Sequence, residues 1–446
     1  MESKVIEFFI LLLILLCFFP VLLGFRKTHF SITADTGFVW SLIFYKDFIF
    51  VVLPAFILVF MGVDEFRTLR MADQNSIFSS SVIFLCSLFL FYILLLFFYR
   101  IMVPGRLISY LSFDSISKVD NKKHFIFAFS FLFAAVFLLL TSIFLFGYRH
   151  AVIYSIFSGE NLLRIRLDNV YASSLPTQIS YLMTVAWWVA AIFSAYLVFI
   201  RKRVLFFVCM VIGLLLASSG GAKAPIIQYF MLFFMSILYF FRPKIKFSKT
   251  IFYLPIYFLL LFLLIFYVVS LQIKDMNISV FLSFLLERLG VGQMAGAYET
   301  LSLEFFVPGS WWHMIPFASF FVDYPVFSKE LMLYTEGAEY DRTGVKNSFF
   351  IAEAFGMGKY FLMYFSPVIM AFSYIVKMLF LFYSIRLFFG VFVARIYTIP
   401  FLFLSTSITG DLSSLALQKG TILLFMVLGL VYLLSIFLKP FLTSIR

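Results

Sequence analysis

The sequence predicts an all-α polytopic integral membrane protein with about eleven transmembrane helices and one large loop outside the membrane. Of its 446 residues, 63% are apolar, 67 are phenylalanine and only 13% are charged, and the mean hydropathy is +1.06. A soluble domain of this size cannot have so little polar surface. The apolar residues also gather in runs of about 20, the length that crosses the hydrocarbon core of a bilayer.

Eleven runs meet this length and composition, although the sixth is short. They are 5–24, 38–62, 77–99, 124–147, 180–200, 204–218, 224–241, 250–270, 360–384, 387–409 and 419–438. The first has neither a basic segment before it nor an A-x-A cleavage site, so we interpret it as a span and not as a signal peptide. Lys46, Asp47 and Lys377 lie inside predicted spans, where pairing with another helix is the usual way to accommodate a charge.

The distribution of Lys and Arg predicts the orientation. Alternate short loops hold 18 such residues on one side of the membrane and 8 on the other, and the richer side faces the cytoplasm. The amino terminus and the long loop then face outward into the periplasm, and the carboxyl terminus faces the cytoplasm. The net charge of +12 fits loops that face anionic lipid, and no basic segment with interleaved aromatics predicts nucleic-acid binding.

The predicted spans divide the chain into three regions. Residues 1–270 contain spans one to eight, 271–360 form the long loop, and 361–446 contain the last three spans. The loop holds ten acidic and six Lys or Arg residues, and a loop of this length usually has a function. Apolar residues recur at helical spacing from Ile278 and stop before Gly290, which predicts an interfacial amphipathic helix. We expect the loop to fold onto the mouth of the helix bundle.

Several kinds of site find no support in the sequence. Three scattered cysteines give neither a disulfide framework nor a metal motif. No nucleotide-binding fingerprint is present, since GVGQMAG (290–296) does not follow a strand pattern. We therefore expect neither a metal nor a cofactor. The two halves of the chain show no repeat, which counts against a secondary transporter.

Four cationic residues on the predicted outer side form a candidate phosphate site. Lys223 follows two glycines in ASSGGAKAPII, Arg164 and Arg166 lie in GENLLRIRLDN, and Arg288 ends the predicted amphipathic helix. Guanidinium groups bind phosphate oxygens in a bidentate manner. An alternative stays open for the arginines, because basic residues near span ends often only anchor the helix at the interface.

Three short motifs, together with the layout of spans, resemble one family. SGGAKAP lies in an outer turn, LLERLGVGQMAGAYETL opens the large loop, and KNSFFIAEAFGMGKYF returns to the membrane. This combination resembles the bacterial O-antigen polymerases of the Wzy type, which are related to the O-antigen ligases and to the enterobacterial common antigen polymerase. The resemblance implies a GT-C-like fold in the bacterial inner membrane. It also implies undecaprenyl-pyrophosphate-linked oligosaccharide as substrate, and membrane lipids, a chain-length regulator and a flippase as partners.

The resemblance also implies residue roles. Arg288 matches the arginine that opens the large loop of these enzymes. Lys223 stands where relatives commonly have arginine. This is a departure, because lysine has the charge but not the planar guanidinium group that binds phosphate in a bidentate manner. The related ligases carry a histidine ahead of an E-x-G-x-x-G-like segment. Glu353, Gly356 and Gly358 keep part of that pattern, but Lys346 and Asn347 occupy the position near which the ligases have the histidine.

The chemistry needs fixed cations for the departing pyrophosphate and at most a weak base for the acceptor hydroxyl. We predict catalytic roles for Arg288, Lys223, Glu299 and His313. We predict substrate contacts for Arg164, Arg166, Trp311, Trp312, Arg342, Lys346 and Glu353. Each acidic or histidine candidate has the alternative of being a solvated or sugar-binding residue, and the tryptophans of being interfacial anchors.

Two classes of function remain. The first is a polymerase that transfers the growing glycan from undecaprenyl pyrophosphate to the terminal sugar of a new lipid-linked unit, or a ligase-like glycosyltransferase. The second is a flippase or transporter of lipid-linked oligosaccharide. The single charged outer loop favours the enzyme, since transporters usually have repeated halves.

Overall fold

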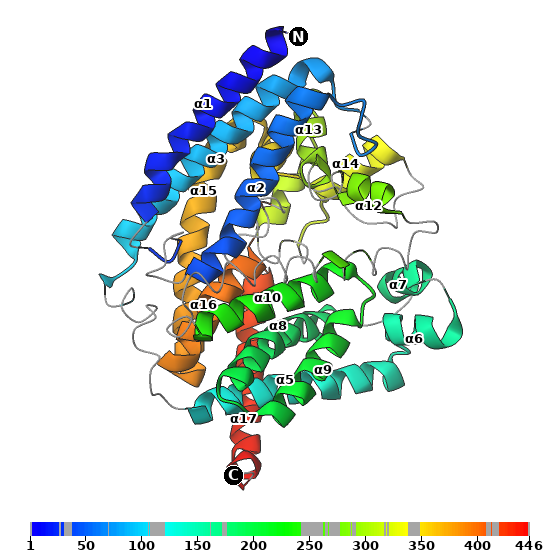
Figure 1. The fold of residues 1–446 in the computed structure, drawn as a ribbon, viewed down its shortest axis with the longest axis vertical. Coiled ribbons are helices and arrows are strands. Elements are labelled where there is room, and N and C mark those ends of the chain that lie inside the picture. The colour runs from blue at the N-terminus through cyan, green and yellow to red at the C-terminus, as the bar shows by residue number, and fades with distance from the viewer. Residues whose placement is uncertain are drawn as a thin grey trace. The chain divides into compact units, whose positions relative to one another are not determined.

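The computed structural model is drawn in Figure 1. It describes residues 2–25, 28–30, 38–69, 71–105, 107, 121–160, 162–171, 176–241, 262–263, 266, 277–285, 287, 291–315, 318, 321–337, 348–406, 412 and 419–444. Within these ranges every regular element is a helix and no strand occurs. The all-α prediction is therefore confirmed for the described chain.

The helices follow the apolar runs of the sequence. They are α1 (Glu2–Gly24), α2 (Phe38–Met61), α3 (Gln74–Met102), α5 (Asn121–Leu145), α6 (Ala151–Ser158), α7 (Leu162–Tyr171), α8 (Thr177–Phe199), α9 (Arg203–Ser218), α10 (Lys223–Phe241), α12 (Ile278–Leu285), α13 (Ala295–Ser302), α14 (Phe327–Glu336), α15 (Phe350–Phe389), α16 (Val391–Ser405) and α17 (Lys419–Ser444), with short 3-10 helices η5 (Val291–Gln293) and η6 (Ser310–Met314).

Seven of the described helices are long and apolar enough to cross a membrane, so the chain is a multi-pass membrane protein. They are α1, α3, α5, α8, α10, α15 and α17. The shorter apolar helices α9 and α16 match two further predicted spans, and α2 coincides with another. The predicted span 250–270 lies outside the described residues except for 262–263 and 266. The figure of eleven spans stays a prediction, as do the three regions.

The chain divides into two compact units, which are described separately. Unit 1 comprises Met1–Lys118, Leu282–Arg386 and Ala394–Ile422, and unit 2 comprises Val119–Phe281, Leu387–Val393 and Leu423–Arg446. In unit 1, α1, α2 and α3 pack side by side (Figure 1). Their centre is aromatic: the fully buried Tyr92 of α3 lies within 6.1 Å, between ring centroids, of Phe18 and of Phe48. Edge-to-face pairs of this kind stabilise more than their buried area alone.

Part of the predicted outer loop packs against α3 in unit 1. Tyr298 of α13 is buried, its ring centroid lies 5.0 Å from that of Phe84, and its hydroxyl is 3.0 Å from the Ser81 hydroxyl. The ring of Phe349, just before α15, also meets that of Phe84, at 5.6 Å between centroids. The motif GVGQMAGAYETL is thus a buried packing element over its described residues. The predicted amphipathic helix begins at Ile278 and ends at Leu285 as α12, and 288–290 lie outside the described residues.

Helix α15 contains a kink and holds the end of α16. Gly358 and Lys359 have non-helical backbone angles, with φ of 51° at Lys359, so the helical path breaks between 350–357 and 360–389. Further along, Lys377 Nζ donates to the Ser405 carbonyl at 3.0 Å and the Tyr374 hydroxyl donates to that of Thr406 at 2.9 Å. The last carbonyls of a helix have no partner within the helix, and these two donors satisfy carbonyls at the end of α16. Lys377 therefore has the interhelical partner that a charge inside a span requires.

Unit 2 is built around α8, which packs against α5, α9 and α10. Small residues let these helices approach closely. A Cβ placed on Gly213 of α9 would lie 2.8 Å from the Ala190 Cβ of α8 and 2.5 Å from the Tyr229 ring of α10. Because α8 and α9 are joined by a short turn at 200–202, they run antiparallel. The end of α9, the start of α10 and the start of α8 therefore lie at one end of this helix group.

Candidate functional site

The short helix α6 is fixed to the end of α9 by His150. The His150 ring caps α6, since Nδ1 accepts from the Ile153 N–H at 3.3 Å, and the opposite nitrogen, Nε2, lies 2.9 Å from the Leu215 carbonyl. The Ala151 N–H donates to the Ser219 carbonyl at 2.8 Å. Burial lowers the pKa of His150, and the neutral ring with its proton on Nε2 satisfies both contacts. His150 is therefore a positioning residue for α6.

The turn between α9 and α10 contains Gly220 and Gly221, and we call it the glycine turn. Gly221 has φ of +71°, which favours glycine. A Cβ there would lie 2.8 Å from the Ala151 Cβ of α6 and 3.6 Å from the Arg166 Cβ of α7. A glycine is thus required both by the backbone and by the close approach of two helices. The glycine turn brings Arg166 beside the segment that leads to Lys223.

Asn169 fixes α7 to the start of α6. Its amide Nδ2 donates to the Arg149 carbonyl at 2.6 Å, and its Oδ1 accepts from the Arg149 N–H at 3.3 Å. Ile165 of α7 is fully buried. Residues two apart on a helix do not face each other, so Arg164 and Arg166 leave α7 in different directions around Ile165. Of the two, only Arg166 has its Cβ at the glycine turn.

The predicted cationic residues are described only in part. Arg164 and Arg166 are exposed, and neither has an acidic side chain within 4.0 Å among the described residues. Lys223 begins α10, two residues after Gly221, but its side chain is not among those described. Arg288, Arg342 and Lys346 also lie outside the described residues. Of the four predicted cations, the structure therefore describes Arg164 and Arg166 fully, Lys223 by its backbone alone, and Arg288 not at all.

In unit 1, Glu299 is completely buried in α13. Its Oε1 accepts a hydrogen bond from the Met71 N–H at 3.3 Å, and nearby the Ser302 hydroxyl accepts from the Asp73 N–H at 3.2 Å. These bonds fix the segment before α3 to α13. Glu299 thus has a structural contact, and its role as a base stays a prediction.

Glu353, one turn into α15, has a comparable contact. Its side chain is 1% exposed and accepts a hydrogen bond from the Leu412 N–H. Three residues on, Gly356 packs directly on the buried Phe327 ring of α14, and its carbonyl accepts from the Val307 N–H at 2.9 Å. The glycine spacing after Glu353 therefore has a packing reason in this chain. The predicted contact of Glu353 with substrate stays a prediction.

Trp311 and Trp312 stack on each other in η6. Their ring centroids are 4.3 Å apart with an interplanar angle of 23°, and 42% of Trp311 is exposed. One face of each ring is covered by its neighbour, so at most the outer faces can meet a sugar. The His313 ring lies 5.8 Å from that of Tyr324. These residues are consistent with either of the alternatives drawn from the sequence.

The structure adds positioning residues that the sequence analysis missed. Asn169 fixes α7 and His150 fixes α6, yet neither belongs to a recognisable motif. The Phe327 ring is the reason for a glycine at 356, because it leaves no room for a side chain there. This contact could not be predicted from the sequence, since 29 residues separate the two. The glycine pair before Lys223 was the one usable signal. Within the described residues no group of three or more His, Cys, Asp or Glu could hold a metal ion.

The chain was compared with known proteins. No family model matches it, and neither a curated protein nor a solved structure does.

Proposed function

We propose that this protein is a membrane-embedded glycosyltransferase that polymerises lipid-linked oligosaccharide units into an O-antigen or a similar surface polysaccharide. The growing glycan moves from undecaprenyl pyrophosphate to the terminal sugar of a new lipid-linked unit on the periplasmic side. The resemblance of the three sequence motifs suggests this reaction. The observation that supports it is the exposed Arg166, which has no acidic side chain within 4.0 Å among the described residues and lies against the glycine turn two residues before Lys223.

The reaction makes specific demands on such a site. The bond between the anomeric carbon and the phosphate oxygen breaks, and the pyrophosphate leaves with the electron pair. The acceptor hydroxyl oxygen bonds to the anomeric carbon, and its proton passes to a base or to water. Fixed cations stabilise the negative charge that develops on the leaving group, and they act best where no counter-ion competes. Within the described residues no acidic side chain competes for Arg166, and its Cβ lies at the glycine turn, two residues before Lys223.

The first test compares Arg166 with Arg164. Arg166→Ala should reduce long-chain polysaccharide at least about tenfold, because loss of one charge-stabilising donor typically costs that much or more. Arg166→Lys should retain part of the product, since charge is kept and the fork is lost. Arg164→Ala should have a smaller effect, because residues two apart on a helix do not face the same way and it is Arg166 whose Cβ lies at the glycine turn. The measurement is the ladder of surface polysaccharide on a gel, normalised to the membrane level of each variant.

A matched control is Lys202→Ala, which removes an exposed cation from the opposite end of α9 and should leave the ladder unchanged. A transporter would fail differently, with single repeat units missing from the outer leaflet. An unchanged ladder from a well-expressed Arg166→Ala, Arg164→Ala double variant would refute the proposal.

A further inference from the structure

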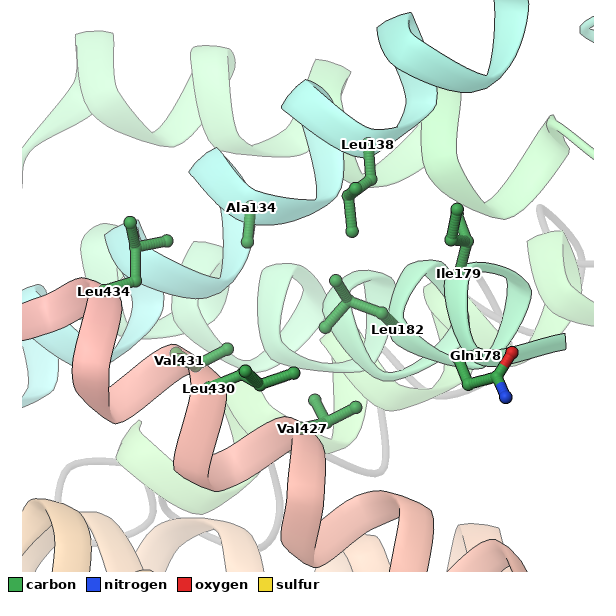
Figure 2. A pocket seen from close by; sticks show the side chains of 9 residues that line it. All are labelled: Ala134, Leu138, Gln178, Ile179, Leu182, Val427, Leu430, Val431 and Leu434. Carbon is green, nitrogen blue, oxygen red and sulfur yellow. The ribbon is translucent and has the colours of Figure 1, made fainter. Parts of the chain in front are cut away.

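An apolar crevice lies within unit 2 between α5, α8 and α17 (Figure 2). Ala134 and Leu138 line it from α5, Leu182 from α8, and Val431 and Leu434 from α17, and it has a volume of about 300 Å³. Gln178, in the first turn of α8, is the only polar side chain in this lining. In Figure 2 its amide lies at one edge, whereas leucine and valine side chains point into the space. The crevice therefore suits a hydrocarbon and offers almost nothing to a polar ligand.

The crevice borders a surface that faces lipid. Leu430, which also lines it, is 66% exposed, and Leu433, three residues further along α17, is 55% exposed. Exposed leucines on an apolar membrane helix contact acyl chains. A hydrocarbon chain can thus enter from the bilayer without crossing a polar barrier.

The polar edge of the crevice lies at the same end of this helix group as Arg166. Gln178 is in the first turn of α8, and α9, which runs antiparallel to α8, ends at Ser218 just before the glycine turn. A Cβ on Gly221 of that turn would lie 3.6 Å from the Arg166 Cβ.

This end of unit 2 also has the character of a membrane interface. On α6, which is fixed to the end of α9, Ile156 is 72% and Phe157 is 87% exposed. A short helix with exposed apolar residues beside exposed arginines is typical of the boundary between headgroups and acyl chains. A ligand spanning both features would have an anionic head at Arg166 and an apolar tail in the crevice.

We infer that the crevice holds the pyrophosphate-proximal isoprene units of a polyprenyl lipid, the donor's own chain. The inference rests on the proposed function. Its argument is chemical: in a polyprenyl pyrophosphate one chain is bonded directly to the anionic head. In a phospholipid, glycerol and two ester carbonyls lie between phosphate and chains, and these polar groups would find only Gln178 in this lining. A volume of about 300 Å³ is at the low end for small-molecule sites, so the distal part of the chain stays in the bilayer.

The test is a binding titration on the full-length protein in detergent, read by native mass spectrometry. The probes are undecaprenyl pyrophosphate, dioleoylphosphatidylglycerol and inorganic pyrophosphate. Ala134→Phe fills the crevice and should weaken binding of undecaprenyl pyrophosphate at least about tenfold, with binding of inorganic pyrophosphate unchanged. The matched control is Leu140→Phe, which enlarges a half-exposed residue of the same helix outside the crevice and should bind every probe as the natural protein does.

The outcomes separate the two proposals. If Ala134→Phe binds undecaprenyl pyrophosphate normally while Arg166→Ala does not, the chain lies elsewhere: the inference fails and the proposed function stands. If the natural protein binds phosphatidylglycerol more tightly than undecaprenyl pyrophosphate, and Ala134→Phe abolishes the binding of phosphatidylglycerol, the crevice holds bulk lipid and the inference fails. If undecaprenyl pyrophosphate does not bind at all, both fail. Should Ala134→Phe not fold, p-benzoylphenylalanine at position 434 should photolabel undecaprenyl pyrophosphate, and absence of that adduct overturns the inference.

Discussion

Replacing Gly356 by alanine probes the packing of α14 on α15. The added Cβ would stand 2.0 Å from Cε2 and 2.3 Å from Cζ of the Phe327 ring. Carbon atoms in ordinary contact are about 3.5 to 4.0 Å apart, so the ring must retreat by about 1.5 Å. Phe327 is fully buried and lies against the Phe305 ring at 5.9 Å, which leaves it little room to do so.

The expected cost follows from two opposing effects. Overpacking a well-filled core costs about 1 to 3 kcal/mol, and so severe an overlap belongs at the upper end. Alanine recovers up to about 1 kcal/mol, because it is a better helix former than glycine. The net loss should be about 2 kcal/mol. At roughly 2 °C per kcal/mol, the midpoint of thermal unfolding should fall by about 4 °C.

The assay is thermal unfolding of the purified protein in detergent, followed by size-exclusion chromatography. Phe327→Leu shortens the ring side chain, so the Gly356→Ala, Phe327→Leu double variant should be more stable than the sum of the single effects predicts, by about 1 kcal/mol. Gly105→Ala is the control, since no atom lies within 4 Å of its added Cβ, and it should be neutral. Strict additivity of the two substitutions, or a midpoint for Gly356→Ala equal to that of the natural protein, would refute the reasoning.

Two further predictions concern pH and orientation. Burial lowers the pKa of His29, between α1 and α2, from 6.5 to about 4, and Nδ1 is 2.6 Å from the Tyr99 hydroxyl. At low pH the unfolded chain then binds a proton at His29 more readily than the folded chain does. The free energy of unfolding is therefore highest above about pH 6.5 and decreases as the pH falls toward about 4. The decrease should be about 2 kcal/mol at about pH 5. His29→Gln should show a smaller drop in unfolding midpoint between pH 7 and pH 5, and an equal drop would count against the burial of a neutral His29. For orientation, Phe321→Cys and Lys202→Cys in a Cys-free background replace exposed residues; an impermeant maleimide should label whole cells at 321 only, and labelling at 202 only would reverse the predicted orientation.

The helices could be located from the sequence alone, but which helices pack against one another could not. Span lengths follow from bilayer thickness, so α1, α3, α8 and α17 could be located from apolar runs alone. The division into two units could not, because it depends on which helices touch, and apolar faces are alike inside a membrane. Nothing in the motif GVGQMAGAYETL indicated that Tyr298 would bury its ring against Phe84.

The candidate site was predictable where backbone geometry demanded a particular residue. Two glycines before Lys223 indicated a tight outer turn, and Gly221 does adopt a positive φ. Sequence spacing placed Arg164 and Arg166 together, yet a helix directs them apart around Ile165. Glu299 and Glu353 were candidates because the acceptor hydroxyl needs at most a weak base, and Glu353 also keeps part of a ligase pattern. Their burial, and the backbone N–H groups that hold them, depend on segments far away in the chain.

The capping of α16 by α15 has a consequence for how the protein is made. Helix α16 has 15 residues, about 22 Å of helix, which is short of the roughly 30 Å hydrocarbon core. Among the described residues, its last carbonyls find their donors, Lys377 and Tyr374, on the preceding helix. Neither the lysine nor the open carbonyls can be left alone in lipid without a large penalty. During synthesis we therefore expect α15 to remain beside the translocon until α16 emerges, so that the two helices leave it together as a hairpin.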